Sequence, residues 1–189
     1  MGGASINGGA LVLRGAMTGD YLDLPDALIS PLTSATIEAY VTWTGAAGGD
    51  WQRIFDFGSS TPQGDGDKYL FLSTRLLRAC YNNATPRAEI FVDSPTPLPP
   101  THVQVAVVVD GNQKQLALFL NGASVGTTSL AQPLSAINDI NNWLGRSQFQ
   151  PDEYFGGSIS EFRIYGAALT AAQLKTSLAM GENTTYLKK

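Results

Sequence analysis

The chain has 189 residues, 43% of them hydrophobic and 15% charged, and its net charge is −4. This length suits one β-sandwich domain, and the low charged fraction argues against a disordered chain or a coiled coil. The Lys and Arg residues form no basic stripe, which disfavours nucleic acid as a partner, and no apolar run approaches the roughly 20 residues of a membrane span, so membrane insertion is not expected.

Short apolar runs between turn residues predict strands in the first half of the chain. The clearest pattern lies between Ser34 and Trp43, where odd positions are apolar and even positions carry polar groups. A period of two predicts one buried face and one face that is wet or turned to a ligand, with Trp43 in the core. In the next strand, strict alternation places Ile54 and Asp56 on one face, opposite Phe55. The other strands predicted here are residues 10–13, 21–24, 51–57, 68–73, 76–81 and 88–92.

The second half of the chain contains a valine-rich strand and a hairpin. Four valines alternate between His102 and Val109 and share one face. Asn121-Gly122 is the strongest hairpin signal of the sequence, because both residues tolerate the positive φ of a two-residue turn. The last strands are predicted at 142–146 and 156–165.

Only the tail predicts a helix, in which Thr170 and Gln173 fit a capping box and Gly181 fits a stop. The apolar residues expected to dock this helix are Leu169, Leu174 and Leu178. About a dozen strands and one short helix predict an all-β fold. We expect a two-sheet antiparallel jelly-roll sandwich with a short C-terminal helix, forming a single domain over residues 1–189.

Three stretches of the chain resemble a known family. They are Gly19–Pro25 with Ala35–Val41, His102–Gly111 with Leu118–Gly122, and Leu144–Arg146 with Tyr154–Tyr165 and Ala168–Ala172. Their order and spacing resemble the concanavalin A-like lectin/glucanase superfamily, specifically the laminin-G-like domains of bacterial extracellular proteins. The resemblance implies the sandwich fold, and it admits lectins, carbohydrate-binding modules, glycosidases and protein-binding domains. The sequence shows no signal peptide, and an extracellular or cell-surface domain of a longer chain is expected.

The resemblance also implies a structural calcium ion, held by Asp20, Glu161 and backbone carbonyls. Relatives often carry Ile-Asp-Glu where this chain has Ile159-Ser160-Glu161, so one family acid is missing. The alternative is that Asp20 is a turn residue and that Glu161 pairs with Arg163 or another cation. Alternation breaks at the same place, which predicts a β-bulge between 159 and 162.

Catalysis finds little support in the sequence, and no catalytic residue is assigned. Glycoside hydrolysis needs two carboxylates that flank the bond, and no strand carries a second acid two or four residues from a glutamate. Acids from separate strands, such as Glu38 and Asp56, remain a possible pair. A thiol mechanism would need Cys80 beside His102, whereas the apolar neighbours of Cys80 indicate a buried thiol.

Binding fits the sequence better, because aromatic rings stack on sugars while Asn, Asp and Arg supply directed hydrogen bonds. The prediction is a non-catalytic carbohydrate-binding module with a glycan or polysaccharide ligand. The alternatives are a protein-interaction or adhesion module of the same fold and a glycosidase. The predicted ligand-binding residues are Asp50, Trp51, Tyr81, Asn142, Trp143, Arg146 and Tyr154. The alternative for the aromatic residues is that they close the ends of the sandwich as part of its core.

Overall fold

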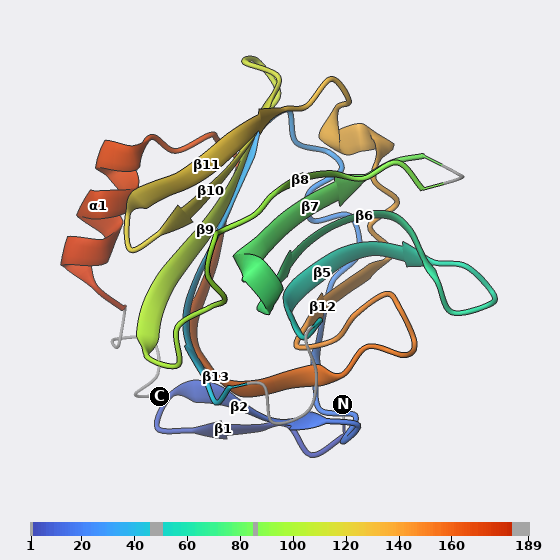
Figure 1. The fold of residues 1–189 in the computed structure, drawn as a ribbon, viewed down its shortest axis with the longest axis vertical. Coiled ribbons are helices and arrows are strands. Elements are labelled where there is room, and N and C mark those ends of the chain that lie inside the picture. The colour runs from blue at the N-terminus through green and yellow to red at the C-terminus, as the bar shows by residue number, and fades with distance from the viewer. Residues whose placement is uncertain (1, 46–50, 85–86, 183–189) are drawn as a thin grey trace.

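The computed structural model describes residues 2–45, 51–84 and 87–182, and within them two antiparallel sheets face each other (Figure 1). The seven-stranded sheet has the order β1 (Ser5–Asn7), β2 (Ala10–Ala16), β13 (Tyr154–Tyr165), β4 (Ala35–Trp43), β9 (His102–Asp110), β10 (Gln115–Leu120) and β11 (Ala123–Ser129). The six-stranded sheet has the order β3 (Leu22–Leu24), β12 (Asn141–Leu144), β5 (Arg53–Ser60), β6 (Gly66–Ser73), β7 (Arg78–Asn82) and β8 (Ile90–Val92).

Helix α1 (Ala171–Met180) lies against the outside of the seven-stranded sheet (Figure 1), and two short 3₁₀ turns, η1 (Arg75–Leu77) and η2 (Leu134–Ala136), complete the fold. The predicted two-sheet sandwich with one C-terminal helix is confirmed. The Asn121-Gly122 hairpin is also confirmed: it joins β10 to β11, with φ of +50° and +69° at its two residues.

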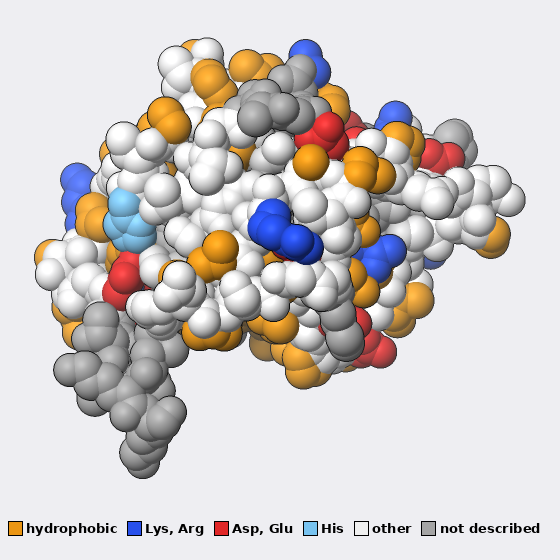
Figure 2. All heavy atoms as spheres, turned by 90° about the horizontal axis from the view of Figure 1, so that it is seen from below, with side chains coloured by type: hydrophobic (Ala, Val, Ile, Leu, Met, Phe, Trp, Pro, Cys, Tyr) orange, Lys and Arg blue, Asp and Glu red, His pale blue; other side chains and the backbone are white. Residues whose placement is uncertain are grey.

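The surface is sparsely charged. On the face seen in Figure 2, Lys and Arg side chains lie apart from one another among neutral atoms. Across the described residues, no helix has the length and apolar character needed to span a bilayer.

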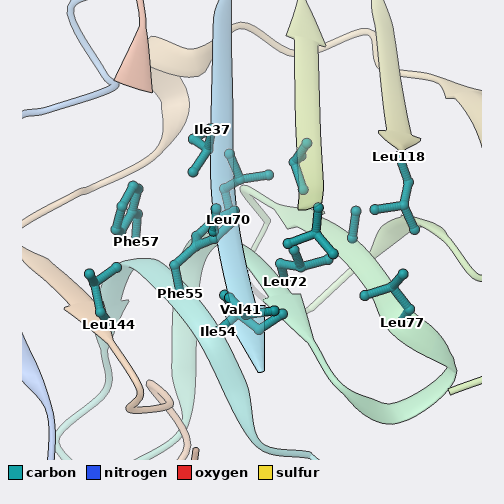
Figure 3. Packing of buried hydrophobic residues seen from close by; sticks show 14 of the residues in the cluster. Ile37, Val41, Ile54, Phe55, Phe57, Leu70, Leu72, Leu77, Leu118 and Leu144 are labelled. Carbon is teal, nitrogen blue, oxygen red and sulfur yellow. The ribbon is translucent and has the colours of Figure 1, made fainter. Parts of the chain in front are cut away.

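The core lies between the two sheets (Figure 3), where aliphatic and aromatic side chains of both inner faces interdigitate. The odd positions of β4, from Ala35 to Trp43, all lie in this core, as their alternation predicts. The prediction for β5 is wrong. A register irregularity between Arg53 and Phe55 puts both Ile54 and Phe55 in the core, and a β-bulge breaks strict alternation in this way.

The predicted bulge in β13 is present as a register shift between Ile159 and Glu161 against β4. It lets Ile159 lie in the core while Phe162 and Ile164 still pack against it. One inserted residue therefore keeps a twelve-residue strand apolar on its inner side.

The even face of β4 is neither wet nor turned to a ligand, which corrects the second half of its prediction. Helix α1 covers this face, with Leu174 fully buried against Val108, Phe119 and their neighbours. The capping box of Thr170 and Gln173 is formed as predicted. The outer face of the seven-stranded sheet is thus occupied by the chain itself.

A buried carboxylate links this helix to the sheet. Glu38 is fully buried and accepts hydrogen bonds from Gln104 Nε2, Tyr165 Oη (3.0 Å) and Ser177 Oγ (3.0 Å). The guanidinium of Arg163 lies 3.3 Å from the same carboxylate. Several donors thus compensate the cost of burying this charge, and a carboxylate so engaged is not open to substrate.

The loop between β12 and β13 (residues 145–153) is held on the outer face of the six-stranded sheet. Asp56 Oδ2 accepts hydrogen bonds from the backbone N–H of Gln148 (3.0 Å) and from Arg53 Nε (3.3 Å). Arg53 also contacts Asp152 at 3.0 Å. Burial raises the pKa of Asp56 to about 7 against the opposing effect of Arg53. The loop therefore depends on a polar cluster in which Arg53 and Asp56 are buried and Asp152 is partly exposed.

Leu174→Ala is expected to loosen α1 and lower the free energy of unfolding by about 2–5 kcal/mol, since it leaves a cavity under the helix. Urea unfolding followed by circular dichroism measures the change. Lys175→Ala, at the next and exposed position, is the control. Equal stability of the two variants would contradict the docking role of Leu174.

Asp56→Asn is expected to remove a pH dependence of stability. A raised native pKa means that the folded state binds the proton more tightly, so this contribution is fully present below about pH 4 and is lost as pH rises through about 7. The difference in melting temperature between the unmodified protein and the variant should therefore decrease as pH rises from about 4 to about 7. Thermal scans at one-unit pH steps measure it, and a constant difference would contradict the raised pKa.

Candidate functional site

Two adjoining hollows lie on the outer face of the six-stranded sheet, where Arg53, Phe71 and Arg78 point away from the core. The Trp51 hollow has a volume of about 230 Å³ and is lined by Trp51, Arg53, Phe71, Arg78, Arg87, Glu89, Phe149 and Asp152. The Arg146 hollow has a volume of about 430 Å³ and is lined by Met17, Ser60, Thr61, Pro62, Gly64, Trp143, Arg146, Ser147, Gln148, Phe149, Gln150, Asp152 and Tyr154. Phe149 and Asp152 belong to both linings, so the hollows form one continuous surface.

Arginines and aromatic rings alternate around the Trp51 hollow. The guanidinium of Arg53 stacks 3.9 Å from the centroid of Phe71, and that of Arg78 lies 4.0 Å from Phe91. The same two guanidinium groups lie 5.8 and 5.3 Å from the ring of Trp51. Cation–π contacts of this kind fix each guanidinium plane and leave its edges for hydrogen bonding.

The three arginines that line the Trp51 hollow are each paired with a carboxylate. Arg78 makes two short hydrogen bonds to Asp93, of 2.6 and 2.7 Å, and Arg87 lies 3.8 Å from Glu89. Arg53 is shared between two carboxylates behind the hollow, as described above. Each arginine of the lining therefore has a carboxylate partner, and hydrogen-bond donors and acceptors are interleaved around the rings.

The Arg146 hollow has a different composition, because its cation rests on aromatic rings alone. The Arg146 guanidinium lies 3.9 Å from the centroid of Trp143 and 4.7 Å from that of Tyr21. Tyr21 also contacts Tyr154, with ring centroids 6.2 Å apart. Gly145 permits this placement: its φ is +84°, and a Cβ there would collide with Leu13.

Four of the predicted ligand-binding residues reach this surface. Trp51 lines the first hollow, and Trp143, Arg146 and Tyr154 gather at the second. Asp50 lies outside the described residues.

The predictions for Tyr81 and Asn142 are wrong, because both side chains are fully buried. Tyr81 belongs to the core, and its hydroxyl donates to the Pro133 carbonyl at 2.8 Å. The Asn142 amide donates to the carbonyls of Pro25 (2.8 Å) and Asp139 (3.1 Å) and so fixes a connection between strands. Both residues sit in strands with their side chains inward, so a surface ligand cannot reach them.

Several site residues escaped the sequence interpretation. They are Arg53, Phe71, Arg78, Arg87, Phe149 and Asp152. Arg53 is turned outward by the bulge in β5, and Phe149 lies in an irregular loop. Only Arg78 had a local signal in the sequence. It is a polar residue at the start of β7, whose inner residues are Ala79 and Tyr81, and this pattern indicates an outward side chain.

The two predicted calcium ligands, Asp20 and Glu161, each contact an arginine. Asp20 accepts from Gly3 N (2.6 Å) and from Arg14 Nε and Nη2 (2.7 and 2.8 Å), and these hydrogen bonds hold the pKa of its carboxyl far below its usual range. Glu161 lies 3.3 Å from Arg163. Over the described part of the chain, no three His, Cys, Asp or Glu side chains gather as a metal centre. A cation at Asp20 would have to displace an arginine.

The acids and nucleophiles considered for catalysis are kept apart by the sandwich. Glu38 lies under α1 on one outer face, and Asp56 lies on the opposite outer face, so the core separates them. Cys80 is buried in the six-stranded sheet, where burial raises the pKa of its thiol, whereas His102 lies in the seven-stranded sheet beside Glu182. Neither of the pairings considered in the sequence is formed by these residues.

Solved structures of similar fold include domains complexed with glycans. The CBM40 of the Ruminococcus gnavus IT-sialidase, bound to α2,3-sialyllactose, matches with a TM-score of 0.73 and 20% identity over 88% of this chain and 95% of that one. Domain 4 of AbnA, a GH43 extracellular arabinanase of Geobacillus stearothermophilus in complex with arabinotriose, matches with a TM-score of 0.67 and 19% identity over 95% of this chain and 81% of that one.

The NanB sialidase of Streptococcus pneumoniae matches with a TM-score of 0.69 and 18% identity, over 94% of this chain and 27% of that one. At these identities the likeness establishes the fold. No curated protein matches this sequence. The model of the Laminin_G_3 family matches residues 16–175, and the chain belongs to the concanavalin A-like lectin/glucanases superfamily.

Proposed function

We propose that this chain is a non-catalytic carbohydrate-binding module that acts as one domain of a larger extracellular protein. The observation that carries the proposal is the Trp51 hollow, in which aromatic rings stand beside paired arginines and carboxylates. A sugar ring offers apolar C–H faces to aromatic side chains, and its hydroxyls both donate and accept hydrogen bonds. A hollow whose arginines are paired with carboxylates, and which offers both donors and acceptors, suits such a ligand.

The rigidity of the hollow supports binding. Arg53 is 2% exposed and is fixed by Asp152, Phe71 and the Trp51 carbonyl, to which it donates at 2.5 Å. Glu89 accepts from the Tyr69 hydroxyl, also at 2.5 Å. Side chains already fixed in place lose little conformational entropy when a ligand binds.

The two carboxylates of the hollow have structural partners, which favours binding over catalysis. Asp152 is held by Arg53 (3.0 Å) and by the hydroxyl of Ser147 (2.7 Å), and Glu89 is held by Tyr69. A hydrolase needs an acid free to exchange a proton with substrate or water. The glycan complexes of the sialidase CBM40 and of the arabinanase domain add support, because those domains have the same fold.

Trp51→Ala is expected to weaken glycan binding by about tenfold or more, because the substitution removes one wall of the hollow and a stacking surface. Trp51→Phe, which keeps a ring, should retain most of the affinity. A glycan array followed by calorimetric titration of the strongest ligand measures both. The same ligand, incubated with the protein and analysed by mass spectrometry, should be recovered uncut.

Other results would change the assignment. Equal affinity of the alanine variant would move the site away from Trp51, and released product would make the chain a glycosidase. Failure to bind any glycan would overturn the proposed function and favour a protein-interaction module of the same fold.

Calcium stays a prediction of the family resemblance, and the structure lets its effect on stability be stated. Because Arg14 occupies the oxygens of Asp20, the melting temperature is expected to be the same in calcium and in chelator. A ligand that binds only the native state must raise the melting temperature. Differential scanning fluorimetry checks this, and a rise that Glu161→Gln abolishes would establish the calcium site.

A further inference from the structure

Arg146 is held in a defined position by stacking alone. Its guanidinium lies over the rings of Trp143 and Tyr21, 3.9 and 4.7 Å from their centroids, and the two rings meet edge to face 6.0 Å apart. Trp143 is 7% exposed, so the ring beneath the cation is itself packed. A guanidinium in such a stack keeps its plane and presents its N–H edges outward.

No carboxylate of the described chain neutralises this cation. The Arg146 side chain makes no hydrogen bond or ion pair with another described residue, whereas Arg53, Arg78 and Arg87 of the neighbouring hollow each have a carboxylate partner. Asp152 is the acid in the lining of the Arg146 hollow, and it is engaged by Arg53 and Ser147. The hollow therefore holds one charge without a counter-charge.

The remaining polar groups of the hollow are neutral. Gln150 is exposed, and Tyr154 and Thr61 are partly exposed, so amide and hydroxyl groups stand around the cation. These groups suit sugar hydroxyls, while the unpaired guanidinium suits a planar oxyanion, to which it donates two parallel hydrogen bonds. The hollow is therefore chemically complementary to a sugar that carries a negative charge.

We infer that the Arg146 hollow is a subsite for an anionic sugar unit, one that carries a carboxylate or a sulfate. The inference rests on the proposed carbohydrate-binding function and specifies its ligand. Phe149 and Asp152 line both hollows, so one oligosaccharide can place a neutral unit in the Trp51 hollow and its charged unit beside Arg146. The module then selects acidic glycans, and Arg146 determines that selectivity.

The test is an array of acidic oligosaccharides printed in three forms: native, with carboxyl groups methyl-esterified, and desulfated. The strongest native ligand and its neutral counterpart are then titrated by calorimetry. The unmodified protein is expected to bind the native form at least about tenfold more tightly, as for a charge-assisted bidentate contact. Loss of binding on esterification identifies a carboxylate, and loss on desulfation identifies a sulfate.

Arg146→Gln is expected to abolish this preference, so that the variant binds the native and the neutral form with about equal affinity. Lys175→Gln is the matched control, because it removes the same charge from an exposed residue of α1, on the opposite face of the molecule, and should keep the preference. Arg146→Lys retains the positive charge but loses the planar pair of N–H donors, so this variant should keep only part of the preference for the native form. Added salt should weaken only the native form, a readout that needs no variant.

The outcomes separate the two proposals. If the unmodified protein binds only neutral glycans, or if Arg146→Gln keeps the full preference, the anionic subsite is overturned while carbohydrate binding stands. If the unmodified protein binds no glycan of any form, the proposed function fails and the subsite fails with it.

Discussion

A buried guanidinium holds the candidate site together. Arg53 emerges from the bulge of β5 and contacts Asp56 on its own strand, Asp152 in the loop after β12, and the ring of Phe71 on β6. A buried cation with one partner would be costly, and here several partners share the desolvation of one charge. Phe149, the wall between the hollows, lies on the loop that Arg53 secures, so the shape of both hollows depends on this contact.

The sandwich uses its two outer faces differently. On the seven-stranded sheet, α1 covers the polar side of β4, and Glu38 joins the two layers through donors from strands and helix. On the six-stranded sheet, a loop covers only part of the face and leaves hollows on either side of Phe149. A closed face adds stability, whereas an open face with fixed polar groups is available to a ligand. The helix-covered face and the face with the hollows thus lie on opposite sides of the sandwich.

The two hollows differ in charge rather than in construction. Both stack arginine on aromatic rings, but the arginines around Trp51 are paired with acids, while Arg146 is not. Arginines that are paired with carboxylates present both donors and acceptors, which suit a neutral ligand. An unpaired arginine is complementary to a ligand with a negative charge. The distribution of carboxylates, more than that of arginines, therefore distinguishes the chemistry of the two hollows.

Much of the fold could be read from local patterns. Alternation from Ala35 to Trp43, the Asn121-Gly122 turn and the capping box of Thr170 each depend on residues near in sequence, and each is present. The site was less readable. Trp51, Trp143, Arg146 and Tyr154 were predicted from residue type. Tyr81 and Asn142 were assigned to loops at strand ends, whereas both lie within strands and their side chains are buried.

The sequence by itself determined the class of fold, the positions of most strands and the helix, and the lack of a paired-acid motif, since these follow from periodicity and turn chemistry. Only the tertiary structure decided that α1 would cover β4 and that Arg14 would take up Asp20. It also decided that Phe149 and Asp152 would join two hollows. The physical reason is that a contact between distant segments, or a one-residue bulge that turns Arg53 outward, leaves no periodic trace in the chain.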